Sequence, residues 1–144
     1  DGAFYGTTRF GGSQDCGVVF RLADGGALTN LHSFTGGGDG SHPFAPLVSS
    51  TNGLYGTARD GGAHGYGTVF RVTTGGELTT LHAFANGLDG SFPSNGLVQG
   101  VDGNFYGAYV QDTELVMSLG INDAFMGIFR CPLENIMSRL SPVS

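Results

Sequence analysis

The chain has 144 residues, of which 27 are glycine and only 12% are charged, and all six basic residues are arginine. An apolar content of 40% can form a packed core, which argues against disorder, and the glycines lack the Gly-X-Y period of collagen. The net charge of −6 and the lack of any apolar run of ~20 residues predict neither nucleic-acid binding nor membrane insertion.

A 50-residue internal repeat organises most of the chain. Residues 4–50 match residues 54–100 at 24 of 47 positions, and a third copy begins at 102–107 before the similarity ends near Tyr109. A fixed period of this size is typical of propellers and other repeat proteins. We therefore divide the chain into repeat 1 at 1–52, repeat 2 at 53–101, the start of a degenerate repeat 3 at 102–109 and a divergent tail at 110–144.

Each repeat is predicted to contain four short strands that are bounded by turn residues. In repeat 2 these strands are 53–58, 67–73, 77–84 and 96–100. The apolar residues Leu78, Leu81 and Phe84 do not alternate strictly, which indicates a bulge or a bend in the third strand. Four antiparallel strands in ~50 residues form one blade of a β-propeller. The predicted fold is therefore all-β, with four-stranded antiparallel propeller-like blades in an incomplete propeller.

The tail has a different pattern from the repeats. Pro132 is followed by apolar residues at the spacing of one helical face, namely Leu133, Ile136, Met137 and Leu140. This pattern predicts a short C-terminal helix near 132–140, with Pro142 as its stop. The helix would cap an exposed blade; the alternative is that the tail comes from a truncated or shifted reading frame.

Five motifs of the second repeat and its continuation resemble the GloVer tandem repeat of bacterial exported proteins. They are Gly-Tyr-Gly-Thr-Val-Phe-Arg (65–71), Gly-Glu-Leu-Thr-Thr-Leu-His-Ala-Phe (76–84), Asp-Gly-Ser-Phe-Pro (89–93), Gly-Leu-Val-Gln (96–99) and Asp-Gly-Asn-Phe-Tyr-Gly (102–107). The resemblance covers residues 1–108. It implies a β-propeller-like fold and an extracytoplasmic or secreted setting. It implies no established reaction, so no catalytic residue follows from it.

The chain is just under three repeats long, whereas a closed propeller needs about four or more blades. We therefore expect a homo-oligomer that completes a ring, a cap supplied by the tail, or a longer parent array. The first residue is Asp1 rather than Met, which indicates a processed, trimmed or partial chain.

Aspartates recur in the loops of the repeats. Asp39 and Asp89 occupy equivalent Asp-Gly-Ser sequences, and Asp24 lies in the predicted hairpin turn of repeat 1. A short carboxylate that accepts backbone N–H bonds stabilises such turns. The functional alternative is a calcium site, because hard cations prefer carboxylate and carbonyl oxygens.

The four histidines divide into a repeated and a non-repeated pair. His32 and His82 are equivalent, which favours a packing role in every repeat. His42 and His64 have no counterpart in the other copy, and loops with such residues are where a grafted site would lie. With Asp15 and Ser41 they are our candidate catalytic residues for a hydrolase that uses histidine as base. The same interpretation includes Asp60 and Ser91 as further candidates.

Arginine and tyrosine also repeat. Arg21 and Arg71 follow the Val-Phe of the second strand, and Tyr5 and Tyr55 lie in the first. Pairing of each arginine with a neighbouring Asp, or its stacking on a tyrosine, is the ordinary interpretation, and the same applies to Arg9 and Arg59. The functional interpretation is a site for sugars or carboxylates formed by Arg21, Arg71, Tyr5, Tyr55, His32 and His82.

Two cysteines, Cys16 and Cys131, suggest one hypothesis, a disulfide that ties the tail to the first blade.

Two function classes remain open. The leading one is a non-enzymatic binding or structural module of a bacterial exterior, which contacts a glycan, a small ligand or a protein through its loops and requires no cofactor. The alternative is a small hydrolase that acts on an ester or a lactone with the assistance of calcium.

Overall fold

The computed structural model describes residues 2–87, 89–101, 103–111, 114–121 and 124–132. Every element of regular structure within these ranges is a β-strand, and the sheets are antiparallel, so the all-β prediction is confirmed. Within the same ranges there is no helix long and apolar enough to span a lipid bilayer. The helix predicted near 132–140 falls outside the described residues, apart from Pro132, which ends the last strand.

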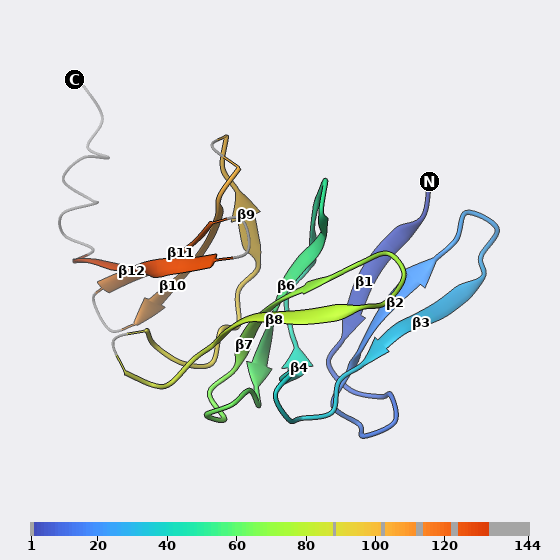
Figure 1. Ribbon diagram of the computed structural model, residues 1–144, viewed down its shortest axis with the longest axis horizontal. Coiled ribbons are helices and arrows are strands. Elements are labelled where there is room, and N and C mark those ends of the chain that lie inside the picture. Colours follow the sequence, from blue (N-terminus) through green and yellow to red (C-terminus); the bar gives the residue numbers. More distant parts are fainter. Residues whose placement is uncertain (1, 88, 102, 112–113, 122–123, 133–144) are drawn as a thin grey trace.

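The strands form three sheets that lie side by side along the molecule (Figure 1). Sheet 1 consists of β1 (Phe4–Thr8), β2 (Val18–Leu22) and β3 (Leu28–Ser33). Sheet 2 consists of β4 (Ser41–Pro43), β6 (Gly53–Asp60), β7 (Thr68–Val72) and β8 (Leu78–Ala83), with β5 (Val48–Ser50) also paired to β6. Sheet 3 consists of β9 (Leu97–Gln99), β10 (Phe105–Gln111), β11 (Glu114–Ile121) and β12 (Ala124–Pro132).

The sheets are offset from the sequence repeats. The fourth strand of each repeat was expected to join the sheet of its own repeat, but β5 pairs with β6, and β9 pairs with β10. The fourth strand therefore joins the sheet of the next repeat, which links neighbouring sheets through the backbone. The divergent region after 109 also adds two strands, β11 and β12, because its apolar residues suit a sheet even though the repeat motif is lost.

The bulge expected in the third strand is present in both copies. Val19 pairs with His32 and Phe20 with Asn30, so Leu31 is the extra residue of β3, and Leu81 is the extra residue of β8. Because of this extra residue, both leucines depart from strict alternation, and both pack against apolar clusters between the sheets.

A glycine lies opposite a phenylalanine in the first two strands of each repeat. Gly6 lies opposite Phe20, and Gly56 lies opposite Phe70. A Cβ atom at Gly6 would lie 2.6 Å from the Phe20 ring, and one at Gly56 would lie 2.7 Å from the Phe70 ring. Each ring therefore covers a glycine on the neighbouring strand, and no other residue fits there without displacing the ring.

The sheets pack with a fixed polarity. We call the face of a sheet that carries Tyr5 and Val19, or Tyr55 and Val69, its front, and the opposite face its back. The front of sheet 1 packs on the back of sheet 2 in a cluster that includes Val19, Leu54, Phe70 and Val72. The front of sheet 2 packs on the back of sheet 3 in a second cluster, formed around Tyr55, Leu97 and Phe105. Both joints thus use the same two faces.

Because of this polarity, the equivalent phenylalanines of the two repeats are buried to different extents. Phe70 is fully buried between sheets 1 and 2, whereas Phe20, on the back of sheet 1, is half-buried. We expect Phe70→Ala to lower the free energy of unfolding by about 3–5 kcal/mol, and Phe20→Ala to lower it by clearly less. Chemical denaturation of the two variants measures the difference, and equal losses would contradict the polarity.

Candidate functional site

Each repeat contains a histidine that bonds to the aspartate of the following loop. His32 Nε2 lies 3.0 Å from Asp39 Oδ2, and His82 Nε2 lies 3.1 Å from Asp89 Oδ2. The backbone N–H of Thr35 donates to Asp39 at 2.9 Å, and that of Ala85 donates to Asp89 at 2.9 Å. The loop between one sheet and the next is therefore closed by the same carboxylate arrangement in both repeats.

The pKa of both carboxyls reflects these bonds. Burial alone would raise the pKa of Asp39, but hydrogen bonds from Thr35 and His32 outweigh it, so that this pKa lies below the ordinary 3.8. Burial likewise opposes a lowering at Asp89, where bonds from Ala85, His82 and Gly87 hold the pKa below 3.8. Both side chains are consequently carboxylates at neutral pH.

The predicted calcium ligands lie in separate places. Asp39 and Asp89 lie in different loops, where each is bonded to its own histidine and turn, and Asp24 is exposed in the turn between β2 and β3. Among the residues that the structure describes, no three His, Cys, Asp or Glu side chains gather as a metal site. The turn-stabilising interpretation accounts for the contacts of Asp39 and Asp89, and calcium binding stays a prediction.

Among the catalytic candidates, His42 has the most developed surroundings. His42 Nδ1 lies 3.2 Å from Asp60 Oδ2, and Asp60 forms an ion pair with Arg59 at 3.0 Å. The backbone of His42 has a positive φ of 53°, a conformation that is uncommon outside glycine. Ser41 is buried and lies opposite Asp60 in the strand register. The structure therefore places a histidine, a carboxylate and a guanidinium in one row.

The other two catalytic candidates have separate roles. Asp15 Oδ1 accepts a hydrogen bond from the backbone N–H of Gly11 at 2.8 Å, which closes its own turn. His64 is exposed in the turn that Gly62 and Gly65 form. Within the described part of the chain, neither side chain bonds to His42. Of the two aspartates among our candidates, Asp60 is the one that bonds to His42.

Two arginines and aromatic rings form a small pocket near this row. Arg9 lies over the rings of Phe10 and Phe44, at 5.0 and 5.4 Å from their centroids, and Arg59 lies 5.3 Å from that of Phe92. The pocket has a volume of about 200 Å³ and is lined by Arg9, Phe44, Arg59 and Ser94. Arg59 thus pairs with the neighbouring Asp60, which is one of the two expected arrangements, and both arginines stack on phenylalanines rather than on the tyrosines of the other.

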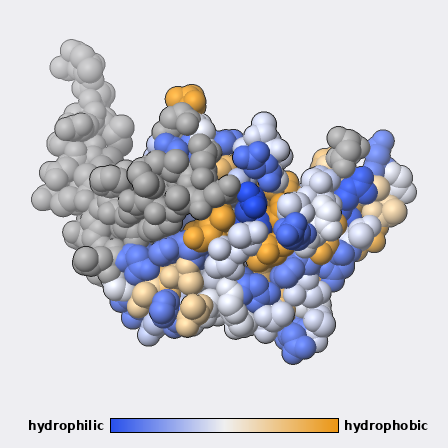
Figure 2. Space-filling model, in the orientation of Figure 1, coloured by the Kyte–Doolittle hydropathy of each residue, from blue (hydrophilic) through white to orange (hydrophobic). Residues whose placement is uncertain are grey.

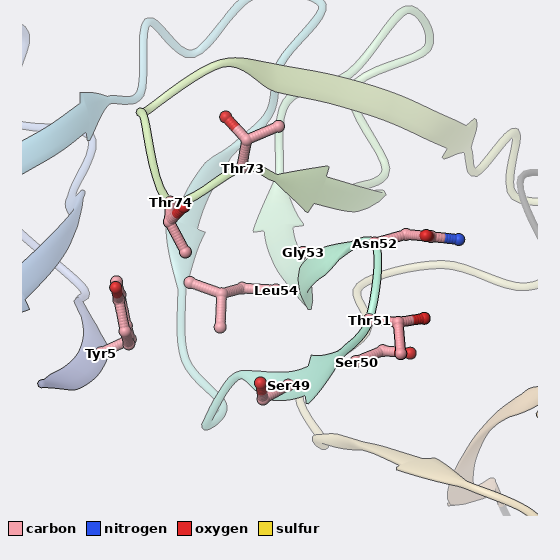
Figure 3. A pocket seen from close by; sticks show the side chains of 9 residues that line it. All are labelled: Tyr5, Ser49, Ser50, Thr51, Asn52, Gly53, Leu54, Thr73 and Thr74. Carbon is pink, nitrogen blue, oxygen red and sulfur yellow. The ribbon is translucent and has the colours of Figure 1, made fainter. Parts of the chain in front are cut away.

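A larger cavity of about 480 Å³ lies between sheets 1 and 2. Tyr5 of β1 lines one side, the β5–β6 hairpin lines another, and the β7–β8 turn lines a third (Figure 3). The remaining lining residues are Ser49, Ser50, Thr51, Asn52, Gly53, Leu54, Thr73 and Thr74. One aromatic ring and a set of neutral hydroxyl and amide groups therefore surround the space.

In the joint between sheets 2 and 3, the equivalent tyrosine lies in a stacked pair of rings. Tyr55 holds the place of Tyr5, and it stacks on Phe105 with ring centroids 4.1 Å apart and an angle of 24°. Phe105 holds the place that Leu54 holds in the other joint, as the strand registers show. Tyr55 is only 3% exposed as a result. The smaller Leu54 leaves Tyr5 half-buried beside the cavity, so only Tyr5 of the two tyrosines lines it.

The remaining ligand-binding candidates do not line the cavity. Arg21 and Arg71 lie opposite Tyr5 and Tyr55 in the strand register, while His32 and His82 hold the loop aspartates. The sequence-based prediction of the site did not include the hydroxyl and amide side chains at 49–52 and 73–74. The Ser-Ser-Thr-Asn of residues 49–52 aligns with the Gln-Gly-Val-Asp of residues 99–102, and this difference between the copies could have indicated the site.

The surface around these sites is mainly polar. Figure 2 shows apolar side chains reaching the visible face in small areas between hydrophilic ones. The thiol of Cys16 donates to the carbonyl oxygen of Gln14 at 3.4 Å. The side chain of Cys131 lies outside the described part of the structure, so the Cys16–Cys131 disulfide stays a hypothesis.

Comparisons with known proteins agree with this architecture. Residues 1–116 match the family model of the Gloeobacter/Verrucomicrobia repeat, which confirms the GloVer resemblance. A crystal structure from Bacteroides fragilis, described as a candidate 6-phosphogluconolactonase, is similar with a TM-score of 0.53 and 19% identity. The similarity covers 88% of this chain and 34% of that one, and it shows a β-propeller-like fold alone. The comparison with curated proteins gives no match.

The lowered pKa values of Asp39 and Asp89 predict a pH dependence of stability. A carboxyl whose pKa is lower in the folded than in the unfolded chain stabilises the fold above its ordinary value. This contribution is lost as the pH falls through the lowered value. We therefore expect the free energy of unfolding to decrease as the pH falls below 3.8.

The double variant Asp39→Asn/Asp89→Asn should flatten this dependence, because neither amide titrates. Chemical denaturation at a series of pH values measures the slope, with Asp24→Asn in the exposed turn as the matched control. A slope that is as steep in the double variant as in the control would show that other groups cause the acid sensitivity.

Proposed function

This chain belongs to the Gloeobacter/Verrucomicrobia repeat family, and we propose that it is a glycan-binding module of a bacterial exterior. The observation that carries the proposal is the cavity beside Tyr5, whose volume of about 480 Å³ lies in the range of small-ligand sites. The extracytoplasmic setting rests on the family resemblance.

The chemistry of the lining favours a neutral sugar. An aromatic ring offers an apolar face to the C–H side of a pyranose, and hydroxyl and amide groups both donate and accept hydrogen bonds. Tyr5 supplies the ring, and Ser49, Thr51, Asn52 and Thr74 are among the polar groups. None of the described residues that line the cavity is Asp, Glu, Arg or Lys, so they offer a charged ligand no counter-ion.

The cavity is built where the repeats differ. Leu54 replaces the stacked phenylalanine of the next joint, and the hairpin after β5 has hydroxyl side chains where repeat 2 has Gly100 and Val101. Residues that vary between repeats are not required for the packing that all blades share, so they can bind a ligand instead. The proposed site therefore uses side chains that the next repeat does not share.

A glycan array followed by isothermal titration calorimetry with the best neutral oligosaccharide tests the proposal. Tyr5→Ala should weaken binding at least about tenfold, because the aromatic platform is lost. Tyr66→Ala, a tyrosine in the loop before β7, is the matched control and should bind as the unmodified protein does. Binding that is unchanged in Tyr5→Ala, or a lack of binding to any neutral glycan, would contradict the proposal.

Hydrolysis of an ester or lactone is the second candidate, and the His42–Asp60 pair favours it. A carboxylate that accepts a bond from Nδ1–H orients the imidazole, which leaves Nε2 to act as a general base. The nearby pocket with Arg9 and Arg59 would suit an anionic substrate. The Bacteroides fragilis structure is described as a candidate lactonase, but the low identity adds only the shared fold to this argument.

Turnover of simple esters and lactones tests the second candidate. His42→Ala should abolish the activity, and His64→Ala, which changes the exposed histidine, should keep it. Addition of EDTA tests the calcium prediction in the same assay, with Asp39→Asn as the variant of the predicted ligand. Activity that survives His42→Ala would remove this candidate.

A further inference from the structure

The back of sheet 1 exposes apolar residues that are buried in the other sheets. Phe4, Leu22 and Leu28 form a row across β1, β2 and β3, because Phe4 pairs with Leu22 and Leu22 with Leu28. Phe4 is 70% exposed and Leu28 is 69% exposed. These exposures are large for apolar residues of a sheet, and Phe4 and Leu28 flank Leu22 on the two edge strands.

The corresponding positions of sheets 2 and 3 are covered. In sheet 2 the row consists of Leu54, Val72 and Leu78, of which Leu54 is 4% exposed and Val72 is fully buried against sheet 1. In sheet 3 the position of Phe4 is taken by Phe105, which is 6% exposed beneath Tyr55. What covers this row in both cases is the front of the preceding sheet, with its tyrosine.

The other end of the array shows the complementary exposure. Tyr106 lies opposite Val98 in sheet 3, as Tyr55 lies opposite Val48 in sheet 2. Val48 packs against the cluster between sheets 2 and 3, whereas Val98 is 67% exposed. The described part of the front of sheet 3 thus offers a tyrosine and a valine at the positions that Tyr55 and Val48 hold in the joint of sheet 2.

We propose that the back of sheet 1 docks on the front of sheet 3 of a second copy of this chain. The contact would continue the joint that the chain already makes twice, with the second copy's tyrosine at position 106 placed on Phe4. Such a head-to-tail contact either closes into a ring or continues as a filament. Two copies bring together six sheets, which lies within the four to eight blades of closed propellers.

The net charge of the chain is compatible with a second copy as the partner, because the contact would be apolar. Phe4 and Leu28 at one end and Val98 at the other are exposed and apolar. Among the residues whose side chains the structure describes, the paired strand positions of these two faces also include exposed polar residues such as Thr8 and Asn30, but no charged one. The net charge of −6 would oppose association through charged surfaces of two identical chains. Apolar end faces give a second copy a contact that this repulsion does not prevent.

Sedimentation velocity over a range of concentrations tests the proposal. The unmodified chain should form a dimer, and Phe4→Glu or Val98→Glu should weaken self-association at least about tenfold, because each places a charge in an apolar joint. Val101→Glu is the matched control, because Val101 is also exposed but lies in the turn between β9 and β10. Circular dichroism checks that the variants fold, as we expect because both substituted positions are exposed.

Mixing the two variants distinguishes a head-to-tail contact from a symmetric one. Phe4→Glu keeps the front of sheet 3, and Val98→Glu keeps the back of sheet 1, so an equimolar mixture should recover one intact joint and form heterodimers. A symmetric contact through sheet 1 alone would leave Val98→Glu unaffected, and this result would overturn the proposal. A chain that stays monomeric at all concentrations would also overturn the proposal. The back of sheet 1 would then be a surface for a further repeat of the same polypeptide rather than for a second copy.

Discussion

The contact between the tyrosine of one sheet and the apolar residue that precedes the next sheet's tyrosine determines how the sheets are arranged. Tyr55 stacks on Phe105 at 4.1 Å, and Tyr5 packs against the cluster that contains Leu54. The contact has a direction, because the tyrosine lies on the front of a sheet and its partner on the back. The remaining features depend on it: the buried Phe70, the strand that crosses to the next sheet, and the exposed residues at the two ends.

Differences between the repeats make the candidate sites. Where Phe105 completes the contact there is a stacked pair, and where Leu54 does so there is a cavity with Tyr5 at its edge. The same reasoning applies to His42, whose counterpart Phe92 has the same positive φ of 53° but an aromatic side chain in place of the imidazole. Both repeats share this backbone conformation, and only the side chain differs, which gives repeat 1 an imidazole that can transfer protons.

Much of the fold could be predicted from the period and its turn residues. The strands of repeat 2, the bulge at Leu81 and the aspartate turns all follow from local sequence. The grouping of strands into sheets could not, because a repeat has no marked beginning: shifting every boundary by one strand leaves the period unchanged. Only the pairing of β5 with β6 and of β9 with β10 shows where a sheet begins.

The contacts within one repeat could be predicted from the sequence, whereas the cavity between two sheets could not. The seven-residue spacing of His32 and Asp39 recurs in His82 and Asp89, so their pairing is a property of one repeat. The cavity is formed by residues 5, 49–54 and 73–74, which come from two repeats, and it depends on the size of one side chain in the joint. Sequence alone contains these residues but does not place the two sheets against each other.

A double-mutant cycle on Tyr55 and Phe105 tests the central contact most directly. The free energy of unfolding would be measured for Tyr55→Ala, Phe105→Ala and the double variant. The stacked geometry predicts a coupling of about 0.5–1.5 kcal/mol between the two rings. Additive losses, with no coupling, would show that the tyrosine does not join the sheets in this way.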